Sequence, residues 1–248
     1  MIIIKNDNEV SLMRKAGKIV GETLFLLENE IKPGITTAEL DRIAEEFITK
    51  HGAKPSFKGL YGFPSSLCIS VNEQVIHGIP GEYMLKDGDI VSIDCGACIN
   101  GFHGDAARTF PVGDISSNAK KLIDVTKESF FKGIEYAKVG NKLGDISHEI
   151  QSYVEAAGFS VVRDFVGHGI GTNVHEDPDV PNFGKSGIGP ELVKGMVLAI
   201  EPMVNMGKHK VKTLRNGWTV VTRDSSLSAH YENTVAILSD GPEILTLV

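Results

Sequence analysis

The stretch Val91–Asp105, VSIDCGACINGFHGD, predicts a β-hairpin that carries two carboxylates. Asn100-Gly101 is the dipeptide most favoured in a two-residue type I′ turn. A turn there places Asp94 opposite Ala107, so that Asp105 is a diagonal neighbour of Asp94 on the same face, about 7–8 Å away at Cα. Two carboxylates on one face repel each other unless a proton or a cation lies between them. A solvated strand with an incidental acidic pair remains the alternative for this stretch alone.

The composition is that of an ordinary globular chain of 248 residues, long enough to bury a substantial core. The net charge of −7 argues against nucleic acid as the main partner. The apolar start Met1–Ile4 is interrupted by Lys5 and is too short for a signal peptide, and no later run is long enough to span a membrane. We therefore expect a cytoplasmic protein.

Three cysteines, Cys68, Cys95 and Cys98, are too few and too odd in number for a disulfide framework. Cys95-Gly-Ala-Cys98 has the spacing of a redox motif, but that chemistry favours a helix N-terminus after the first cysteine, and this pair lies in a predicted hairpin. A structural zinc site would need a second pair of ligands. Both remain weak alternatives to packing within the strand.

Apolar periodicity and capping signals predict four helices. Asn6 with Glu9, and Thr36 with Glu39, have the spacing of capping boxes at the starts of the first two helices. The third helix begins at Ser117. The fourth runs from about Leu143 to Ala157, and the predicted strands are Leu67–Val71, Gln74–His77, Ile90–Asp94 with its hairpin return, Val161–Phe165, Val197–Glu201, Trp218–Thr222 and Tyr231–Leu238.

The same order of two helices followed by strands occurs twice, which indicates an internal repeat. Leu85–Asp94 aligns with Leu192–Glu201 at a constant offset of 107, and Gly34 and Gly52 have counterparts at an offset of 106. We therefore predict an α+β fold in which two half-repeats, roughly residues 7–110 and 117–240, are related by approximate two-fold symmetry. They would form a single catalytic domain, residues 1–248, with the site between the halves.

Three further residues join the aspartate pair as candidates for chemistry. The repeat places Glu201 at the position of Asp94, and Glu232 stands at the head of an apolar strand. His168 lies between glycines in VGHGIG, which brings backbone close to whatever the histidine touches. Two Asp, two Glu and one His suit a pair of divalent ions such as Mn, Fe(II), Co or Zn better than a thiolate site does. A turn-forming histidine and solvated strand-end acids are the alternatives.

Several motifs together resemble the methionine aminopeptidases of the pita-bread fold. They are the Asp94/Asp105 separation, GHGIG around His168, IEPM from Ile200, YENT from Tyr231, NEQVIHGIP from Asn72 and NGWT from Asn216. The similarity runs from about Asp7 to the C-terminus. The short N-terminus resembles the bacterial type I form.

This resemblance implies a dinuclear hydrolase that removes the initiator methionine from nascent proteins when the second residue is small. One ion would be held by Asp94, Asp105 and Glu232, and the other by Asp105, His168, Glu201 and Glu232. A hydroxide that bridges the two ions would attack the peptide carbonyl, with Glu201 transferring the proton. The metal could be Co, Mn, Fe(II) or Zn.

The resemblance also implies two catalytic histidines and a methionine pocket. His175 would donate to the substrate carbonyl or oxyanion, and His77 would contact the backbone nitrogen of the second residue. The pocket would be formed by Phe63, Cys68, His77, His175 and Trp218. Leu60, Phe63 and Val174 depart from the aromatic residues or tyrosine usual in the family, which leaves the pocket's detailed shape open.

The remaining implications concern cations, partners and alternatives. A monovalent cation would bind near Asn72, Gln74 and Ser228. The expected partners are the N-termini of nascent chains, with the ribosome as a further candidate and a monomer as the default state. An Xaa-Pro peptidase and a metal-free peptide-binding protein of the same fold are the competing functions.

Overall fold

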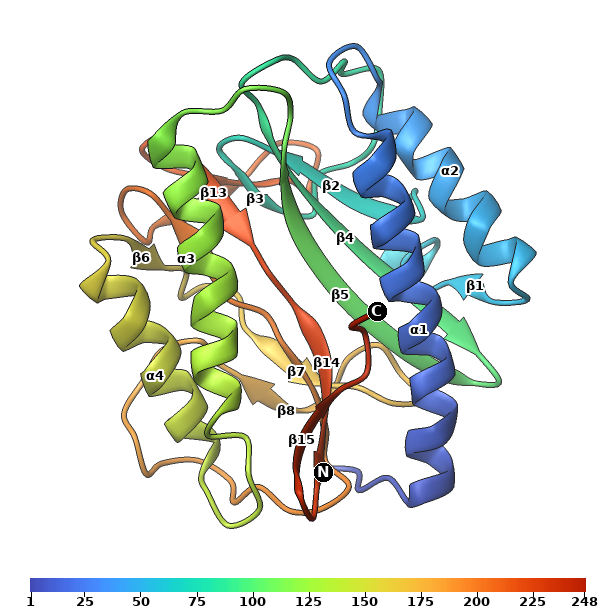
Figure 1. Ribbon diagram of the computed structural model, residues 1–248, viewed down its shortest axis with the longest axis vertical. Coiled ribbons are helices and arrows are strands. Elements are labelled where there is room, and N and C mark those ends of the chain that lie inside the picture. The colour runs from blue at the N-terminus through green and yellow to red at the C-terminus, as the bar shows by residue number, and fades with distance from the viewer.

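Two pairs of helices flank the strands in the computed structural model, which describes all 248 residues (Figure 1). One pair belongs to the first half of the chain and the other pair to the second half. The helices are α1 (Asp7–Glu30), α2 (Thr37–Lys50), α3 (Ser117–Ile134) and α4 (Leu143–Ala156), and a short 3-10 turn spans Leu60–Gly62. None of them is long and apolar enough to cross a membrane.

Fifteen strands form four sheets, and every strand pairing is antiparallel. The first half contributes β1 (Lys54–Pro55), β2 (Leu67–Val71), β3 (Gln74–Ile76), β4 (Ile90–Ile99) and β5 (Phe102–Pro111). The second half contributes β6 (Ser160–Val161), β7 (Gly167–Gly169), β8 (Glu176–Val180), β9 (Val197–Ile200), β10 (Met203–Asn205), β11 (Val211–Thr213), β12 (Val220–Thr222), β13 (Ser228–His230), β14 (Asn233–Leu238) and β15 (Gly241–Ile244). The sheet orders are β1-β4-β2 with β5 beside β4, β13-β10-β6, β11-β12-β3 and β15-β14-β9-β7-β8.

The predicted hairpin forms with the predicted register. Asn100 and Gly101 have φ angles of 54° and 80°, as a type I′ turn requires at both central positions. Asp94 on β4 lies opposite Ala107 on β5, and Asp105 lies opposite Gly96. The local turn chemistry therefore fixes the relative positions of the two aspartates.

The helix caps follow the sequence, with one exception. The side chain of Asn6 accepts from the backbone N–H of Glu9, and the Glu9 carboxylate accepts from the N–H of Asn6, which completes the predicted box. The side chain of Thr36 accepts from the N–H of Glu39. The Glu39 carboxylate, however, accepts from Arg42 on the helix surface, so the second half of that predicted box is wrong.

The two half-repeats share their backbone geometry. Equivalent glycines adopt left-handed conformations that glycine tolerates best, and equivalent residues form isolated β-bridges. The matched features are Gly34 (φ 94°) with Gly140 (φ 91°), Gly88 (φ 91°) with Gly195 (φ 88°), and the bridge Thr36–Met84 with the bridge Lys142–Glu191.

The halves meet along β5 and the chain that joins β13 to β14. The backbone N–H of Ala107 donates to the carbonyl of Glu232 at 3.3 Å, and the N–H of Glu232 donates to the carbonyl of Ala107 at 2.9 Å. Asp94 is opposite Ala107, and extending the β9–β14 register by one step places Glu201 opposite Glu232. A local two-fold axis therefore runs between Ala107 and Glu232.

Two threonines repeat this symmetry on either side of the axis. The Thr109 hydroxyl accepts from the backbone N–H of His230 at 2.8 Å and donates to its carbonyl at 2.9 Å. The Thr234 hydroxyl makes the same two bonds to Asp105, both at 2.9 Å. The residue numbers of each symmetric pair, Thr109 with Thr234 and Asp105 with His230, differ by 125.

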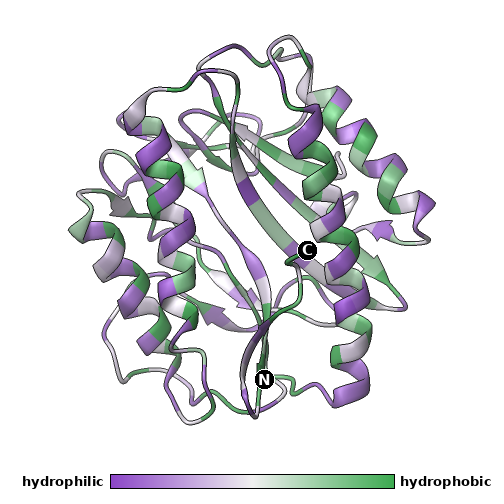
Figure 2. Cartoon of the chain, in the orientation of Figure 1, coloured by the Kyte–Doolittle hydropathy of each residue, from purple (hydrophilic) through white to green (hydrophobic).

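Separate apolar clusters support the two halves. One lies under α1 and α2 and includes Leu27, Leu40 and Ile93, and another lies under α3 and α4 and includes Phe130 and Ile146. Figure 2 shows each helix divided between hydrophobic and hydrophilic residues, as expected of helices that cover sheets. The strands at the seam thus have packed support on each side.

Several predicted strand boundaries are wrong. The predicted strand Val161–Phe165 ends at Val161, because Arg163 and Asp164 turn out to solvent. The strand predicted from Trp218 begins at Val220, because the side chain of Asn216 accepts from the N–H groups of Trp218 and Thr219 and holds them in a turn. Strands β1, β7, β8, β10, β11, β13 and β15 were not predicted as separate elements.

Candidate metal centre and active site

The five predicted ligands come together in one cavity of about 210 Å³. They arrive from the strands on both sides of the seam. Asp94 lies on β4, Asp105 on β5, His168 on β7, Glu201 directly after β9 and Glu232 directly before β14.

Three of the four acids are buried, Asp94 is partly buried, and none forms an ion pair with a lysine or arginine. Asp105, Glu201 and Glu232 are 4%, 9% and 2% exposed. No lysine or arginine forms an ion pair with any of the four acids. The nearby Arg108 donates instead to the backbone carbonyl of Glu232 and to the side chain of Asn233. Buried carboxylates in this arrangement need protons or cations between them.

Burial and mutual repulsion change how these acids titrate. Burial raises the pKa of Asp105 to about 7. Burial, followed by the charges of neighbouring acids, raises the pKa values of Asp94, Glu201 and Glu232 well above the usual range. Without a metal the cluster therefore holds protons near neutral pH, and a divalent ion has to displace them.

His168 is oriented as a neutral nitrogen donor. Its Nδ1 lies 2.9 Å from the Gly169 carbonyl, which assigns the proton to Nδ1 and leaves the Nε2 lone pair free. Nε2 lies 3.6 Å from Glu201 Oε1 and 3.9 Å from Asp105 Oδ2. Burial lowers the pKa of His168 to about 4, so the imidazole is uncharged at neutral pH.

The glycines around His168 allow β7 to pack closely against the backbone of its neighbours. A Cβ at Gly167 would lie 2.3 Å from the Ala199 carbonyl oxygen, and one at Gly169 would lie 2.1 Å from that of Asp177. His168 belongs to a short strand, β7, between β8 and β9, rather than to a loop. This sheet position fixes the imidazole opposite the acids.

The donor set fits divalent cations. Asp94 Oδ1 and Asp105 Oδ1 are buried and have no hydrogen-bond partner. Donor atoms from Asp105, His168 and Glu232 lie within 4.8 Å of one another. Carboxylate oxygens combined with imidazole nitrogen suit Mn, Fe(II), Co or Zn.

His230 is a site residue that the sequence reasoning missed. Atoms of Asp94, His230 and Glu232 form a second group that spans less than 4.8 Å. The signal was available, because His230 precedes Glu232 by two residues and such residues share a face of an extended chain. This spacing is a weaker signal than the repeat or the glycine-rich segment, because many strands carry two polar residues on one face.

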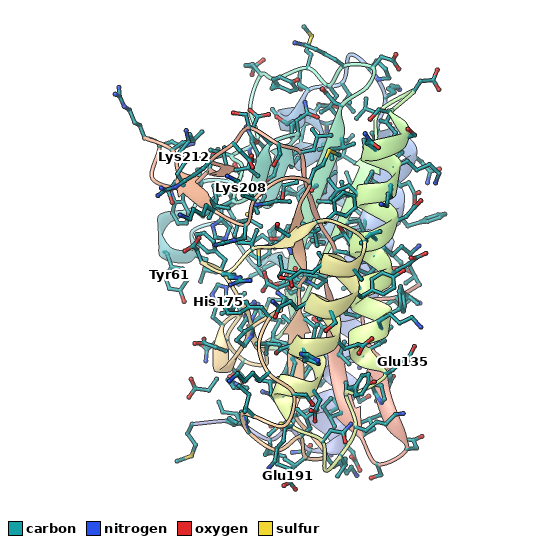
Figure 3. All side chains as sticks on the ribbon, turned by 90° about the vertical axis from the view of Figure 1, so that its left-hand side faces the viewer. Tyr61, Glu135, His175, Glu191, Lys208 and Lys212 are labelled. Carbon is teal, nitrogen blue, oxygen red and sulfur yellow. The ribbon has the colours of Figure 1, made fainter.

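An apolar recess adjoins the acids in the same cavity. Phe63 and Trp218 meet edge to face with ring centroids 5.1 Å apart, and Cys68 lies opposite Asp94 across the β2–β4 pairing. The sequence did not single out Phe57 and Tyr61, which also line the cavity. Figure 3 shows Tyr61 and His175 on the same side of the molecule, away from α3.

The two predicted catalytic histidines, His77 and His175, line both the metal cavity and a second recess of about 400 Å³. The rings of His175 and His168 meet edge to face at 4.4 Å. Burial lowers the pKa of His175, and it lowers the pKa of His77 to about 4, so both rings are neutral at pH 7. His77 also contacts Phe165, which lines the second recess.

The remaining predicted positions have these surroundings. Leu60 lines the cavity, and Val174 is buried in the same apolar cluster as Phe63. Ser228 donates from its backbone N–H to the carbonyl of Asn72 at 2.9 Å, and the Gln74 side chain accepts from the N–H of Val71.

The C-x-x-C pair lies within a strand. Both cysteines are free and belong to β4, with Cys95 buried opposite Leu67 and Ala106. No helix begins at Cys95, so the redox-motif alternative is wrong.

The fold and the acid–histidine cavity define the chain as a metal-dependent peptidase. Residues 11–239 match the sequence pattern of metallopeptidase family M24. The chain belongs to metallopeptidase family M24 and is a hydrolase that binds divalent metal.

Its similarity within that family is to the methionine aminopeptidases. The methionine aminopeptidase of Clostridium perfringens is 77% identical over 248 residues, which covers all of both chains. The crystal structure of the methionine aminopeptidase from Rickettsia prowazekii is 45% identical with a TM-score of 0.98, also over all of both chains. The predicted resemblance and the α+β pita-bread fold are therefore confirmed. Prolidase from Pyrococcus furiosus, 24% identical with a TM-score of 0.80, shares the fold over 99% of this chain and 66% of its own.

Proposed function

We propose that the chain removes the initiator methionine from nascent proteins whose second residue is small, using two divalent ions. The observation that carries this proposal is the cavity itself, in which buried acids and His168 directly adjoin an apolar recess that contains Trp218. The similarity to methionine aminopeptidases supports the same activity. All 248 residues would act as one catalytic domain.

The acids and His168 would divide between the two ions. Asp94, Asp105 and Glu232 would hold one, and Asp105, His168, Glu201 and Glu232 would hold the other, so that Asp105 and Glu232 are shared. When bound, such ions act as Lewis acids on the peptide carbonyl and lower the pKa of water enough to supply a nucleophile at neutral pH. The donor set is compatible with Co, Mn, Fe(II) and Zn.

Glu201 would act as the proton carrier of the reaction. Its carboxyl lies in the cavity between His168 and His230, with one oxygen 3.6 Å from His168 Nε2 and the other 3.8 Å from His230 Nε2. A carboxylate in this position can accept a proton from the attacking water and return it to the leaving amine. The leaving group would then depart as the free N-terminus of the shortened protein.

The two neutral histidines would orient the scissile peptide. His175 would donate a hydrogen bond to the carbonyl oxygen, where negative charge develops during attack. His77 would contact the backbone nitrogen of the second residue. Their position on the walls of both recesses supports this division, with methionine on one side and the rest of the polypeptide on the other.

The methionine side chain would occupy the apolar recess. Phe63, Cys68 and Trp218 offer an apolar and polarizable lining, together with His77 and His175 at its edge. Thioether sulfur makes favourable contacts of about 0.3–1.5 kcal/mol with aromatic rings. Such contacts would favour methionine over an aliphatic side chain of similar size.

Nascent N-termini are the proposed partners, in the cytoplasm, with the protein acting as a monomer. The ribosome is a further proposed partner. Lys208 and Lys212 are exposed on the same side of the molecule as Tyr61 and His175, so they could face an anionic surface beside the cavity (Figure 3). The monovalent cation near Asn72, Gln74 and Ser228 is also part of the proposal.

Peptide hydrolysis across a series of divalent ions tests the proposed function. We expect the metal-loaded protein to cleave Met-Ala and Met-Gly peptides but not Met-Lys or Xaa-Pro peptides. Preferential cleavage of Xaa-Pro peptides would favour the Xaa-Pro peptidase alternative. Absence of hydrolysis with every ion would favour a peptide-binding protein.

A further inference from the structure

The two-fold symmetry of the fold gives Asp105 a counterpart in the second half, and that counterpart is His230. Both residues have their backbone N–H and carbonyl bonded to a threonine hydroxyl of the opposite half, Thr234 for Asp105 and Thr109 for His230. The fold therefore holds His230 in the second half as it holds a proposed metal ligand in the first.

The imidazole of His230 is buried among the acids and lacks a hydrogen-bond partner at Nε2. The residue is 2% exposed. Nε2 lies 3.8 Å from Glu201 Oε2 and 3.9 Å from Glu232 Oε2. Both separations are too long for a hydrogen bond. A buried imidazole nitrogen without a hydrogen-bond partner destabilises the fold, so its position calls for a partner.

The Nε2 atom of His168 lies at similar distances from two carboxylate oxygens. It lies 3.6 Å from Glu201 Oε1 and 3.9 Å from Asp105 Oδ2. Two donor atoms about 2.1 Å from a common ion lie about 3.0 Å apart at a right angle and about 4.2 Å apart when opposite each other. The separation between His230 Nε2 and Glu232 Oε2 falls within that interval, as do both separations around His168. A carboxylate oxygen of Asp94 lies within 4.8 Å of ligand atoms of His230 and Glu232.

We propose that His230 is a metal ligand, which binds through Nε2 the ion shared by Asp94 and Glu232. Each of the two ions then has one imidazole, His168 on one side and His230 on the other. This inference rests on the proposed dinuclear site and adds a nitrogen ligand to it. The alternative is that His230 only donates a hydrogen bond to a ligating carboxylate.

Pulsed electron paramagnetic resonance of bound Mn(II) distinguishes these roles, because it detects directly coordinated imidazole nitrogen. In the His168→Ala variant, nitrogen coupling should persist, since the His230 ring remains. It should disappear in the double variant His168→Ala/His230→Gln. Absence of coupling in the single variant, or its persistence in the double variant, would overturn the ligand role.

Calorimetric titration with Mn(II) supplies a second readout that does not depend on activity. We expect His230→Gln to weaken binding of one ion by at least the roughly 10–100-fold that loss of an outer-shell partner costs. His103→Gln is the matched control, because His103 is a half-buried histidine of β5 that bonds to Ser56 outside the cavity. Its two binding steps should equal those of the unmodified protein.

The proposal and the proposed function can fail separately. If the unmodified protein binds two ions and cleaves Met-Ala, while His230→Gln binds both ions as tightly, only the ligand role of His230 is wrong. If the unmodified protein binds no ion, the dinuclear function fails, and the ligand role fails with it. Circular dichroism and thermal unfolding of each variant verify that the fold is retained.

Discussion

At the scale of single residues, Asp105 is positioned by both halves of the fold. Its register comes from the hairpin turn, and its backbone is bonded to Thr234 of the other half. Burial holds its pKa at about 7. In the proposed site it contacts both ions, whereas Asp94 contacts one.

Replacing Asp105 by alanine should therefore abolish hydrolysis and weaken the binding of both ions together. We expect the loss of affinity to exceed the roughly 10–100-fold that removal of an outer-shell partner causes. Metal stoichiometry and Met-Ala hydrolysis, measured on the same sample, check this. Asp114→Ala, at an exposed position, is the control, and two tightly bound ions in Asp105→Ala would contradict the shared role.

At the scale of elements, α1 approaches the strands closely enough to require glycine. A Cβ added at Gly17 would lie 2.2 Å from the carbonyl oxygen of Leu245, and one at Gly104 on β5 would lie 2.8 Å from the backbone nitrogen of Gly17. These contacts place α1 directly against β5, one residue from Asp105. The helix thus supports the metal cavity from behind.

Gly17→Ala should destabilise the protein although it lies within a helix. Alanine in an exposed helix position would gain about 1 kcal/mol over glycine. Here the clash is with backbone, so we expect a net loss of about 1–3 kcal/mol in the free energy of unfolding. Denaturant titration measures it, with Gly81→Ala as the control, since a Cβ at Gly81 meets nothing within 4 Å. An increase in stability would show that α1 can shift away.

The elements that the sequence predicted well are those with local signals. Asn100-Gly101 sets the hairpin register, and Asn6 with Glu9 sets the start of α1, because these residues bond only to near neighbours. Strands β10, β11 and β13 contain three residues each, and β10 and β13 pair with each other from distant positions. No local periodicity of three residues could reveal them.

The same distinction applies to the site. Asp94 and Glu201 could be paired from the repeat alone, and family motifs indicated the other ligands. Neither the repeat nor a family motif indicated His230, for which the sequence offers only the two-residue spacing to Glu232. The threonine bonds add its symmetry with Asp105, which requires the structure. The position of His230 relative to Asp105 depends on the pairing of β13 with β10 and of β14 with β9, which local sequence does not reveal.

At the scale of the whole molecule, the seam between the half-repeats coincides with the metal cavity. The reciprocal backbone bonds of Ala107 and Glu232 cross the two-fold axis, and the two threonine bridges flank it. Stability and metal binding should therefore change together when the seam is altered.

Thr234→Val removes the hydroxyl but keeps the shape of the side chain. It leaves the backbone N–H and carbonyl of Asp105 without those partners, so we expect a loss of about 1–3 kcal/mol in the free energy of unfolding. Metal affinity should fall as well, because Asp105 loses its support. Denaturant titration with and without metal measures both effects. The exposed Thr213→Val is the control, and unchanged metal affinity in Thr234→Val would show that the hairpin alone positions Asp105.

The metal-free protein should become less stable as the pH rises from about 6.5 to 8. Burial raises the pKa of Asp105 to about 7 and raises those of Asp94, Glu201 and Glu232, so the folded state holds protons that the unfolded chain has released. Each such proton lowers the free energy of unfolding by about 1.4 kcal/mol for every unit of rising pH over which it remains bound. Burial lowers the pKa values of His168 and His230. These histidines therefore make the protein more stable as the pH rises, but only below about 6.5, the pKa of histidine in the unfolded chain.

Thermal unfolding at the two ends of this pH interval, with chelator or with saturating metal, measures the effect. Divalent ions should reverse it, because they replace the protons and bind more tightly as the pH rises. A metal-free protein whose stability increases over the same interval would contradict the assignment of raised carboxyl pKa values.

Trp218 gives the molecule a built-in optical reporter. It is the sole tryptophan of the chain, half-buried at the cavity wall against Phe63. Selective excitation of indole fluorescence therefore observes one position, the proposed methionine recess. Entry of a peptide into that recess can be followed in real time on the unlabelled protein, separately from the steps that occur at the acids.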